Sequence, residues 1–384
     1  MHLMILNNKK QSLYLLFLLL SSFFLPPLLI LFFIIFESII KNKFLVTRVL
    51  LSSYLGFINT NKLLESDLLG YNISYENSSL SNILSIGKEP LYFFSEFIFS
   101  NLNLPFSGFL FFVTFSSYML LYKASLNFCK KHKLLDSLFL ILFITFFSNI
   151  FTLSAHLIRQ FIAMSIIIYA ISLENRKTSI FLTFLSFLIH SSALLFIPIF
   201  FKSLDKKLTF KVLVYFFLGV FLLIQFINFV LTLLADIPFF NYFYNRSTSG
   251  IDAFTTSESM GSFSFIFLFL LISLNILNSL KHHRERNNFL FFNIISLFSI
   301  FIFVISFFND LIAYRYLQYL IVYFPFVFFL FLSRFKNVQI LFILKFGIIV
   351  FLCFYFFYKI ENGVWNYGPV EYLIYGPVEY LINL

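Results

Sequence analysis

Long apolar runs recur along the chain, and polar residues gather in the short stretches between them. A run of about 20 apolar residues is long enough to cross a bilayer as a helix. The pattern therefore predicts an all-α, polytopic integral membrane protein with about 10 transmembrane helices. We expect spans at residues 13–36, 44–59, 104–122, 134–153, 156–173, 210–234, 262–280, 289–308, 311–332 and 338–358. The segment 89–102 is short and amphipathic, which predicts one interfacial helix.

The composition supports this fold class. The chain is 60% hydrophobic and 11% charged, whereas a soluble domain carries about 25% charged residues. We treat residues 1–384 as a single integral membrane domain. The net charge of +10 is explained by Lys and Arg in short loops, so we expect no nucleic acid partner. Cys129 and Cys353 are too few for a disulfide framework or a thiolate metal site.

The charges of the loops predict an orientation. Basic residues mark the loops 123–133, 174–178, 202–209 and 281–288, and the positive-inside rule places these in the cytoplasm. The loops 60–103 and 235–261 carry acidic residues in excess, which places them outside.

The segment 178–201 has basic residues on both sides. If it crossed the membrane once, every later loop would change sides, and "KHHRER" at 281–286 would lie outside. A re-entrant helical hairpin that turns at His190, Ser191 and Ser192 fits all the loops. The alternative is a single span that violates the charge rule.

Several polar side chains fall near the outer ends of the predicted spans. Ionisable groups at this depth are costly and usually face a cavity or a partner. Arg159 lies in the first turn of the span 156–173, and Arg315 lies in the first turn of the span 311–332. Each also has a simple structural explanation, because an arginine near a helix end can extend to the interface. The other members of the set are His156, Gln160, His190, Glu89, Asp67, Tyr71, Tyr75 and Asp310.

These residue types suggest a chemistry. Guanidinium groups suit phosphate, because they offer a planar fork of donors, so Arg159 and Arg315 could hold a lipid-linked diphosphate. His190 could take a proton from an attacking hydroxyl, and the carboxylates Asp67 and Glu89 could serve as the base instead. The remaining expected substrate-binding residues are Gln160, Tyr71, Tyr75, Asp310 and, from the aromatic loop 238–250, Tyr244 and Arg246. Purely structural roles are the alternatives. His190 could be a hydrogen-bonded histidine of the core, and Tyr71 and Tyr75 could belong to an aromatic belt at the membrane interface.

Motifs of nucleotide and metal enzymes are missing. The sequence has no Walker motif, Rossmann fingerprint, HExxH or DxD site. We therefore expect no cofactor and no metal, and a donor that is already activated in the membrane.

Four stretches carry a resemblance to a known family. They are "SDLLGYNISYEN" (66–77), "GKEPLYFFSEFI" (87–98), "IRQFIAMSIIIYAI" (158–171) and "FLSFLIHSSALLFIPIF" (184–200). In this order, with the arginine helix at 314–316, they resemble the EpsG-like family of Wzy-type polysaccharide polymerases. Leu91 departs from the family, in which many members have Gly at this position.

The resemblance implies a reaction on the outer face of the bacterial cytoplasmic membrane. Such an enzyme joins undecaprenyl-pyrophosphate-linked oligosaccharide repeat units, and the lipid pyrophosphate leaves. A flippase and a chain-length regulator of the same pathway are its candidate partners, together with the lipid bilayer. The resemblance implies that Arg159 and Arg315 bind diphosphate, that His190 or Asp67 is the base, and that Gln160, Tyr71, Glu89 and Arg246 orient the sugars.

Other functions remain open from the sequence. A flippase for the same lipid-linked oligosaccharide would need a cationic cavity, but it usually has internal repeats, and none is visible at domain scale. An O-antigen ligase or an acyltransferase is another alternative, although a ligase should present a larger outer loop. The chain could also be a structural membrane protein.

Overall fold

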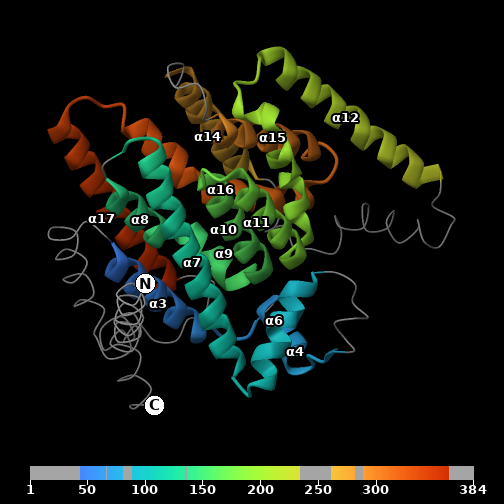
Figure 1. Ribbon diagram of the computed structural model, residues 1–384, viewed down its shortest axis with the longest axis vertical. Helices are drawn as coiled ribbons and strands as arrows, with labels where there is room; N and C mark the ends of the chain where they lie inside the picture. The colour runs from blue at the N-terminus through green and yellow to red at the C-terminus, as the bar shows by residue number, and fades with distance from the viewer. Residues whose placement is uncertain are drawn as a thin grey trace, which may run out of the picture. The chain divides into compact units, whose positions relative to one another are not determined.

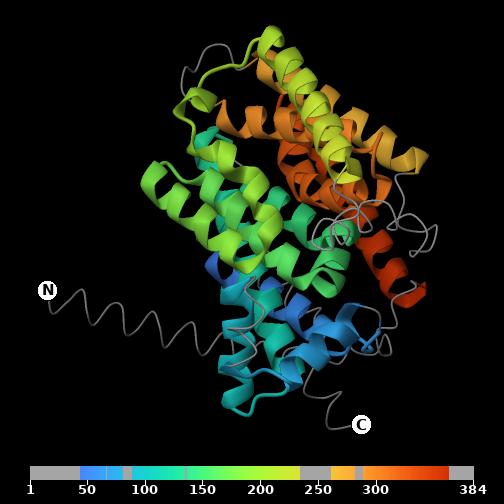
Figure 2. The same cartoon turned by 90° about the vertical axis from the view of Figure 1, so that its right-hand side faces the viewer.

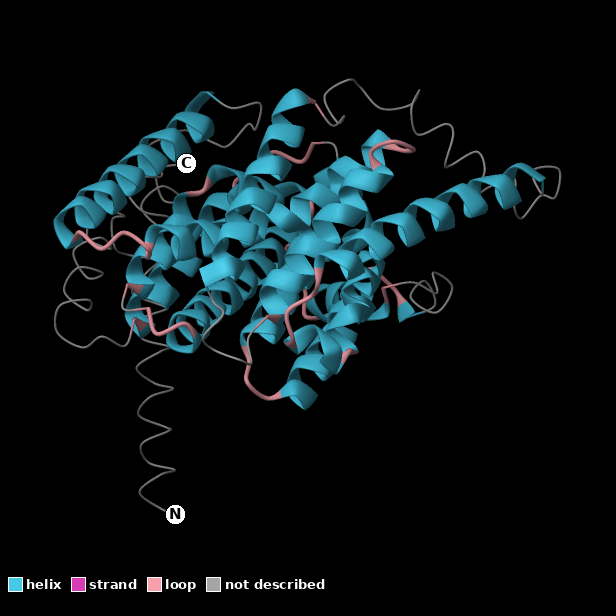
Figure 3. Ribbon diagram, turned by 90° about the horizontal axis from the view of Figure 1, so that it is seen from above, coloured by secondary structure: helices cyan, strands magenta, loops and turns pink. Residues whose placement is uncertain are grey.

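The protein is described here by a computed structural model, which covers residues 44–65, 67–80, 89–134, 136–233, 261–281 and 289–362. Every regular element in these ranges is a helix, as Figure 3 shows. The chain divides into two compact units. Unit 1 comprises Met1–Leu194 and Asn337–Leu384, and unit 2 comprises Leu195–Lys336.

Unit 1 holds the larger set of helices. Its described elements are α3 (Leu45–Thr60), α4 (Asp67–Glu76), α6 (Pro90–Asn101), α7 (Phe106–Lys131), α8 (Ser137–Phe146), α9 (Ser148–His156), α10 (Ile158–Ser172), α11 (Arg176–Ile189) and α17 (Val338–Asn362). In Figures 1 and 2, α4 and α6 lie side by side at the N-terminal end of α7.

Small and polar residues let the helices of unit 1 approach closely. A Cβ atom added at Gly56 of α3 would lie 2.7 Å from the ring of Phe111 on α7, so only glycine fits this crossing. One turn later, the amide of Asn59 donates to Thr114 on α7 (3.0 Å) and to Ser154 on α9 (2.9 Å). These bonds fix the C-terminal ends of α3 and α9 beside each other.

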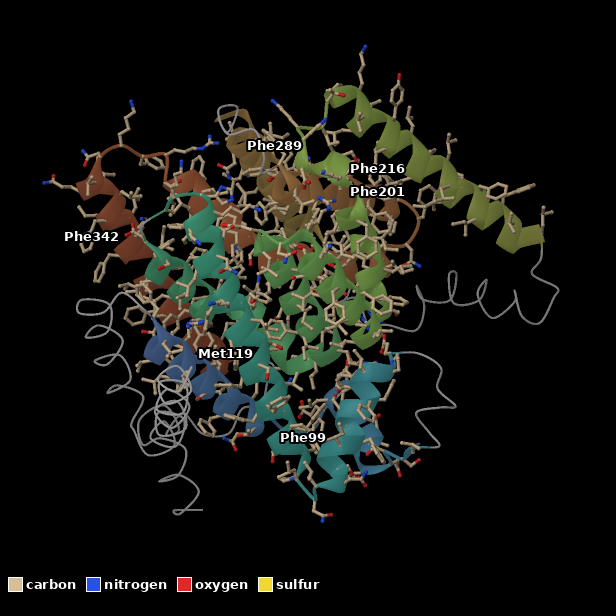
Figure 4. The ribbon with its side chains drawn as sticks, in the orientation of Figure 1. Phe99, Met119, Phe201, Phe216, Phe289 and Phe342 are labelled. Carbon is tan, nitrogen blue, oxygen red and sulfur yellow. The ribbon has the colours of Figure 1, made fainter. Side chains whose placement is uncertain are left out.

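Aromatic side chains join α6 to α7. The ring of Phe99 lies 5.4 Å from Phe109 and 4.9 Å from Phe112, and Figure 4 shows it at the N-terminal end of α7. Tyr75 of α4 packs against Phe106 and Phe109 of α7, with ring centroids 5.6 and 5.5 Å apart. A shared apolar cluster therefore holds α4 and α6 against α7.

Unit 2 contains η1 from Leu195 onward, η2 (Lys202–Asp205), α12 (Phe210–Leu233), α14 (Ser262–Lys281), α15 (Leu290–Ile305) and α16 (Asp310–Leu332). Helices α14, α15 and α16 pack on one another, and α12 packs on α15. Buried asparagines bond across these contacts: the amide of Asn278 donates to Val327 O (2.9 Å), and that of Asn293 donates to Leu204 O (2.7 Å).

The predicted spans that fall within the described residues are helical, but not all of these helices are long enough to cross a membrane without a bend. Five described helices have the length and apolar composition of a span, namely α7, α12, α14, α16 and α17. Helices α8 and α9 would make a sixth as a pair bent by 56° at Phe147, within the predicted span 134–153. Helix α10 has 15 residues, or about 22 Å of rise, which is less than the ~30 Å hydrocarbon core. The prediction of an all-α chain with membrane-compatible helices is confirmed for the described residues, but the count of about 10 spans is not confirmed, and 13–36 lies outside the described residues.

Two boundaries differ from the prediction. The loop 123–133 is helical as far as Lys131, because α7 continues through Lys123 and Lys130; lysine is a good helix former and favours the last turn. In the predicted hairpin, α11 ends at Ile189, His190 is extended, and the 3₁₀ helix η1 begins at Ser191. This break agrees with two half-helices, and whether the segment turns back in a membrane stays a prediction.

Candidate functional site

Three elements of unit 1 each place one ionisable side chain in a common cluster. Glu89 directly precedes α6, Arg159 is the second residue of α10, and His190 follows the last residue of α11. In the sequence, Arg159 lies 70 residues after Glu89, and His190 lies 101 residues after Glu89. The fold therefore brings together three residues that separate parts of the sequence each predict as site residues.

Glu89 has an unusual backbone. Its φ of 54° and ψ of 46° are left-handed, a conformation that costs a non-glycine residue of order 1 kcal/mol or more. Pro90 fixes the first turn of α6. Because the Glu89 side chain does not cap α6, its carboxylate is available to the two other elements.

The carboxylate of Glu89 accepts four bonds. Oε2 accepts from Arg159 Nη1 at 2.6 Å, and Oε1 accepts from His190 Nδ1 at 2.5 Å. The backbone N–H and the hydroxyl of Ser191 donate to Oε1 at 3.2 and 3.3 Å. The Glu89 side chain is only 6% exposed, whereas Arg159 is 31% and His190 22% exposed. Glu89 is thus the buried centre of the cluster, and its two basic partners are the more exposed side chains.

This arrangement keeps Glu89 ionised. Burial by itself raises the pKa of Glu89, but the bond and charge of His190, the charge of Arg159 and the Ser191 N–H outweigh it and lower the pKa to about 2. A carboxylate that stays charged at all physiological pH values is a poor proton acceptor. Its geometry suits orienting its two partners instead.

Aromatic rings surround the guanidinium of Arg159. Its Cζ lies 5.1 Å from the ring centre of Tyr71, 5.7 Å from Tyr92 and 5.8 Å from Phe93, within the range of cation–π attraction. Arg159 Nε is buried without a hydrogen-bond partner among the described residues. Burial raises the pKa of Tyr71, against the lowering effect of Arg159. Helix α4, which carries Tyr71, thus covers one side of Arg159.

A second carboxylate lies two turns along the same face of α6. Glu96 is fully buried, Ser74 of α4 donates to its Oε2 at 2.9 Å, and its Oε1 has no partner in the described ranges. Burial raises the pKa of Glu96 to about 7, although the Ser74 bond and the charge of Arg159 oppose the shift. Glu89 and Glu96 therefore hold their protons at very different pH values, although they share one helix face.

The other predicted residues of unit 1 have different positions. Gln160 is buried in α10, next to Arg159. Asp67 is exposed at the start of α4. Tyr75 is buried, and its hydroxyl donates to Leu104 O at 2.7 Å, which is a structural contact within the aromatic cluster.

The remaining predicted residues lie elsewhere. Arg315 and Asp310 belong to α16 in unit 2, where Asn309 caps the helix by accepting from Ile312 N at 2.9 Å. Because α16 begins at Asp310, Arg315 is in its second turn, not in the first turn as predicted. Tyr244 and Arg246 lie outside the described residues.

Sequence reasoning missed Tyr92, Phe93 and Glu96. The available signal was the spacing of Glu89, Tyr92, Phe93 and Glu96 at i, i+3, i+4 and i+7, which places all four on one face of a helix. Within the described ranges, no group of three or more His, Cys, Asp or Glu side chains is placed to hold a metal ion. The cluster can orient a histidine and present a guanidinium to an anion or a sugar.

Comparison with known proteins gives a match to a family model. A family model described as the EpsG family matches residues 46–372, and this range contains the whole cluster. No curated protein and no solved structure matches the chain.

Proposed function

The chain belongs to the EpsG family, and we propose that it is a Wzy-like polymerase of the bacterial cytoplasmic membrane. It joins lipid-pyrophosphate-linked oligosaccharide repeat units into a surface polysaccharide on the outer face. The family supports a role in polysaccharide polymerisation, and the apolar helices support a membrane protein. The single observation that carries the proposal is the contact of Glu89 with both His190 and Arg159.

Glu89 determines how His190 takes part. When the Nδ1–H of the neutral ring donates a hydrogen bond to Glu89, Nε2 is left as a proton acceptor. The carboxylate also stabilises the imidazolium that forms when Nε2 takes a proton, as in other carboxylate–histidine pairs. His190 is therefore the proposed general base, and Glu89 is its positioning residue.

The bond changes balance without a cofactor. The hydroxyl oxygen of the acceptor unit attacks the anomeric carbon at the reducing end of the donor chain, and its proton passes to His190 Nε2. The bond between the anomeric carbon and the phosphate oxygen breaks, and its electron pair leaves with the lipid diphosphate. Arg159 has N–H groups beyond the one bonded to Glu89 and contributes them to the diphosphate. A role of Arg315, in α16 of unit 2, in binding diphosphate stays a prediction from the sequence.

The roles of the other residues are proposed from their positions. Tyr71, whose ring lies 5.1 Å from Arg159 Cζ, and Gln160, the next residue in α10, are proposed to orient sugar hydroxyls. Asp67 is the alternative base, at the exposed start of α4. The outer-loop residues Tyr244 and Arg246 would bind sugars from the segment 238–250.

In vitro polymerisation tests the proposal. Purified protein in detergent should convert a defined lipid-linked repeat unit into a ladder of polymers and release lipid diphosphate. Arg159→Ala should leave single repeat units, and Arg159→Lys should not restore the ladder, because lysine lacks the planar fork whose further N–H groups can reach a diphosphate while Nη1 is bonded to Glu89. Asp136→Asn is the matched control, since Asp136 is exposed and pairs with Lys345 at α8. A ladder from Arg159→Ala equal to that of the control would refute the site.

A further inference from the structure

Helix α4 lies beside α6 (Figures 1 and 2) and meets it through a buried carboxyl group. Glu96 of α6 is fully buried, and the hydroxyl of Ser74 on α4 donates to its Oε2 at 2.9 Å. Its Oε1 and the hydroxyl of Tyr92, one turn earlier in α6, are buried without a hydrogen-bond partner among the described residues. A carboxylate in these surroundings lacks most of the donors that would stabilise its charge. The contact therefore favours a protonated Glu96, in which Oε2 accepts from Ser74 and Oε1 holds the proton.

The same contact sets the position of Tyr71. Tyr71 lies three residues before Ser74 in α4, and its ring centre lies 5.1 Å from Cζ of Arg159. The ring also meets that of Tyr92 edge-on, with centroids 6.2 Å apart. Residues i and i+3 lie on the same side of a helix, so Ser74 and Tyr71 face the same neighbours. Loss of the Ser74–Glu96 contact would therefore free Tyr71 to leave the guanidinium.

A second attachment of α4 does not involve Glu96. Tyr75 packs against Phe106 and Phe109 of α7, with centroids 5.6 and 5.5 Å apart, and its hydroxyl donates to Leu104 O at 2.7 Å. These contacts attach α4 to α7, whereas Glu96 controls its contact with α6. Release of Ser74 from Glu96 would thus loosen α4 on α6 without unfolding the unit.

Burial makes Glu96 the group of this contact that titrates near neutral pH. It raises the pKa of Glu96 to about 7, although the Ser74 bond and the charge of Arg159 oppose the shift. Burial also raises the pKa of Tyr75 and of Tyr92 above 10.0, and an arginine such as Arg159 stays charged. Among these groups, Glu96 is therefore the one that changes charge from about pH 6 to about pH 9.

The charged groups of the other nearby elements act elsewhere or can be held constant. Helix α7 meets this face of α6 with aromatic rings. Helix α11 also packs on α6, and His190 at its end is bonded to Glu89, two turns from Glu96. Lys62, which precedes α4, has a pKa of about 7, because burial outweighs its two acidic neighbours. A comparison at constant Lys62 therefore isolates Glu96.

We propose that Glu96 is a positioning residue, which in its protonated form holds α4 against α6 and keeps Tyr71 beside Arg159. This inference rests on the proposed function, in which Arg159 binds the diphosphate and Tyr71 orients a sugar. When Glu96 loses its proton, the cost of a buried carboxylate drives α4 away from α6, and water then solvates the charge. Tyr71 leaves Arg159 with α4, and the site loses a group that orients its substrate.

Hydrogen exchange of α4 in the full chain in detergent tests the contact. The ratio of wild-type to Glu96→Gln exchange rates cancels the intrinsic pH dependence of exchange and the titration of Lys62, and the glutamine can still accept from Ser74. The ratio should rise by about tenfold or more from pH ~6 to ~9, because a pKa moved from 4.5 to about 7 allows a change of up to roughly a hundredfold. Glu76→Gln, at an exposed acid of α4, should exchange as wild type. A ratio that does not change with pH would overturn the proposal.

The polymerisation rate tests the consequence at Arg159. The wild-type rate relative to that of Glu96→Gln should fall by about tenfold from pH ~6 to ~9, because the ionised wild type loses the position of Tyr71. In a Tyr71→Ala background, which is slow at every pH, the same ratio should stay constant. A purely structural role of Glu96 would leave the pH dependence of the ratio the same in both backgrounds, which would contradict a role through Tyr71.

The outcomes separate this inference from the proposed function. Melting temperatures at about pH 6 show whether Glu96→Gln is folded, as expected for a substitution that keeps the shape of the side chain. A pH-dependent exchange ratio in a protein that makes no polymer would support the hold of Glu96 on α4 and reject the polymerase. A constant exchange ratio in a protein that makes polymer would reject the role of Glu96 and leave the polymerase supported.

Discussion

At the scale of single residues, Glu89, which precedes α6, and Glu96, within α6, show how surroundings determine chemistry. Glu89 meets His190 and Arg159, and its pKa falls to about 2; Glu96 meets Ser74, and its pKa rises to about 7. Both are buried, so the difference comes from their partners and not from depth. Glu89 is suited to hold a charge permanently, and Glu96 is suited to gain and lose a proton near neutral pH.

Protonation of Glu89 should destabilise the fold at low pH. Its pKa is lower in the folded protein, about 2, than its ordinary value of 4.5, so the unfolded chain binds more protons between these values. Stability should therefore fall as the pH drops from 4.5 to 2. Thermal unfolding in detergent should show this slope in the wild type and a flatter one in Glu89→Gln. Equal slopes would show that the Glu89 contacts do not form.

The contribution of Glu96 to the stability of the fold should change with pH in the opposite direction. Its pKa is raised from 4.5 to about 7, so the folded protein binds more protons in this window and becomes less stable as the pH rises from 4.5 to 7. Glu96→Gln should remove this loss, because an amide stays neutral and can still accept from Ser74. Hydrogen exchange of α4 at pH 8 should be slower in Glu96→Gln than in the wild type. Faster exchange in the variant would contradict the assignment.

At the scale of helices, small residues and amides control how closely α3, α7 and α9 approach. Sequence patterns predicted these helices well, because long apolar runs leave little choice of structure in a membrane. They did not predict the 56° bend at Phe147, since no proline or glycine marks it. They also could not show that Arg159 and His190 share Glu89, because a contact across 101 residues depends on tertiary packing. Glu89, Arg159 and His190 could be predicted as site residues because they are polar in apolar surroundings. Tyr92 and Phe93 could not, because aromatic residues are common throughout this sequence.

Gly56 gives a test of the packing of α3 on α7. Gly56→Leu should destabilise the protein by about 1–3 kcal/mol, because the side chain would overlap the Phe111 ring. Gly219→Ala in α12 is the control, since no atom lies within 4 Å of its added Cβ, and it should be neutral or slightly stabilising. Melting temperatures in detergent compare the two. A Gly56→Leu variant as stable as the control would show that α3 and α7 are farther apart.

At the scale of the whole molecule, the proposed function requires that the cluster of Glu89, Arg159 and His190 opens to the outer face. The proposal predicts that a cysteine at Glu65 is labelled by an impermeant maleimide from outside and that one at Lys177 is not. The re-entrant interpretation of 178–201 predicts that cysteines at Lys202 and Lys281 are labelled from the same side. Cys129 and Cys353 are replaced first. Labelling of Lys202 and Lys281 from opposite sides would establish a single span instead.

The most direct test of the central claim is a double-mutant cycle on the rate of glycosyl transfer. If His190 is the base and Glu89 acts through it, His190→Ala should lower the rate by about 10²–10⁴-fold, Glu89→Gln should lower it substantially, and the double variant should be about as slow as His190→Ala alone. Transfer of one lipid-linked repeat unit to another, measured in a single turnover, gives these rates. Losses that multiply in the double variant would contradict the account, because Glu89 and His190 would then act independently.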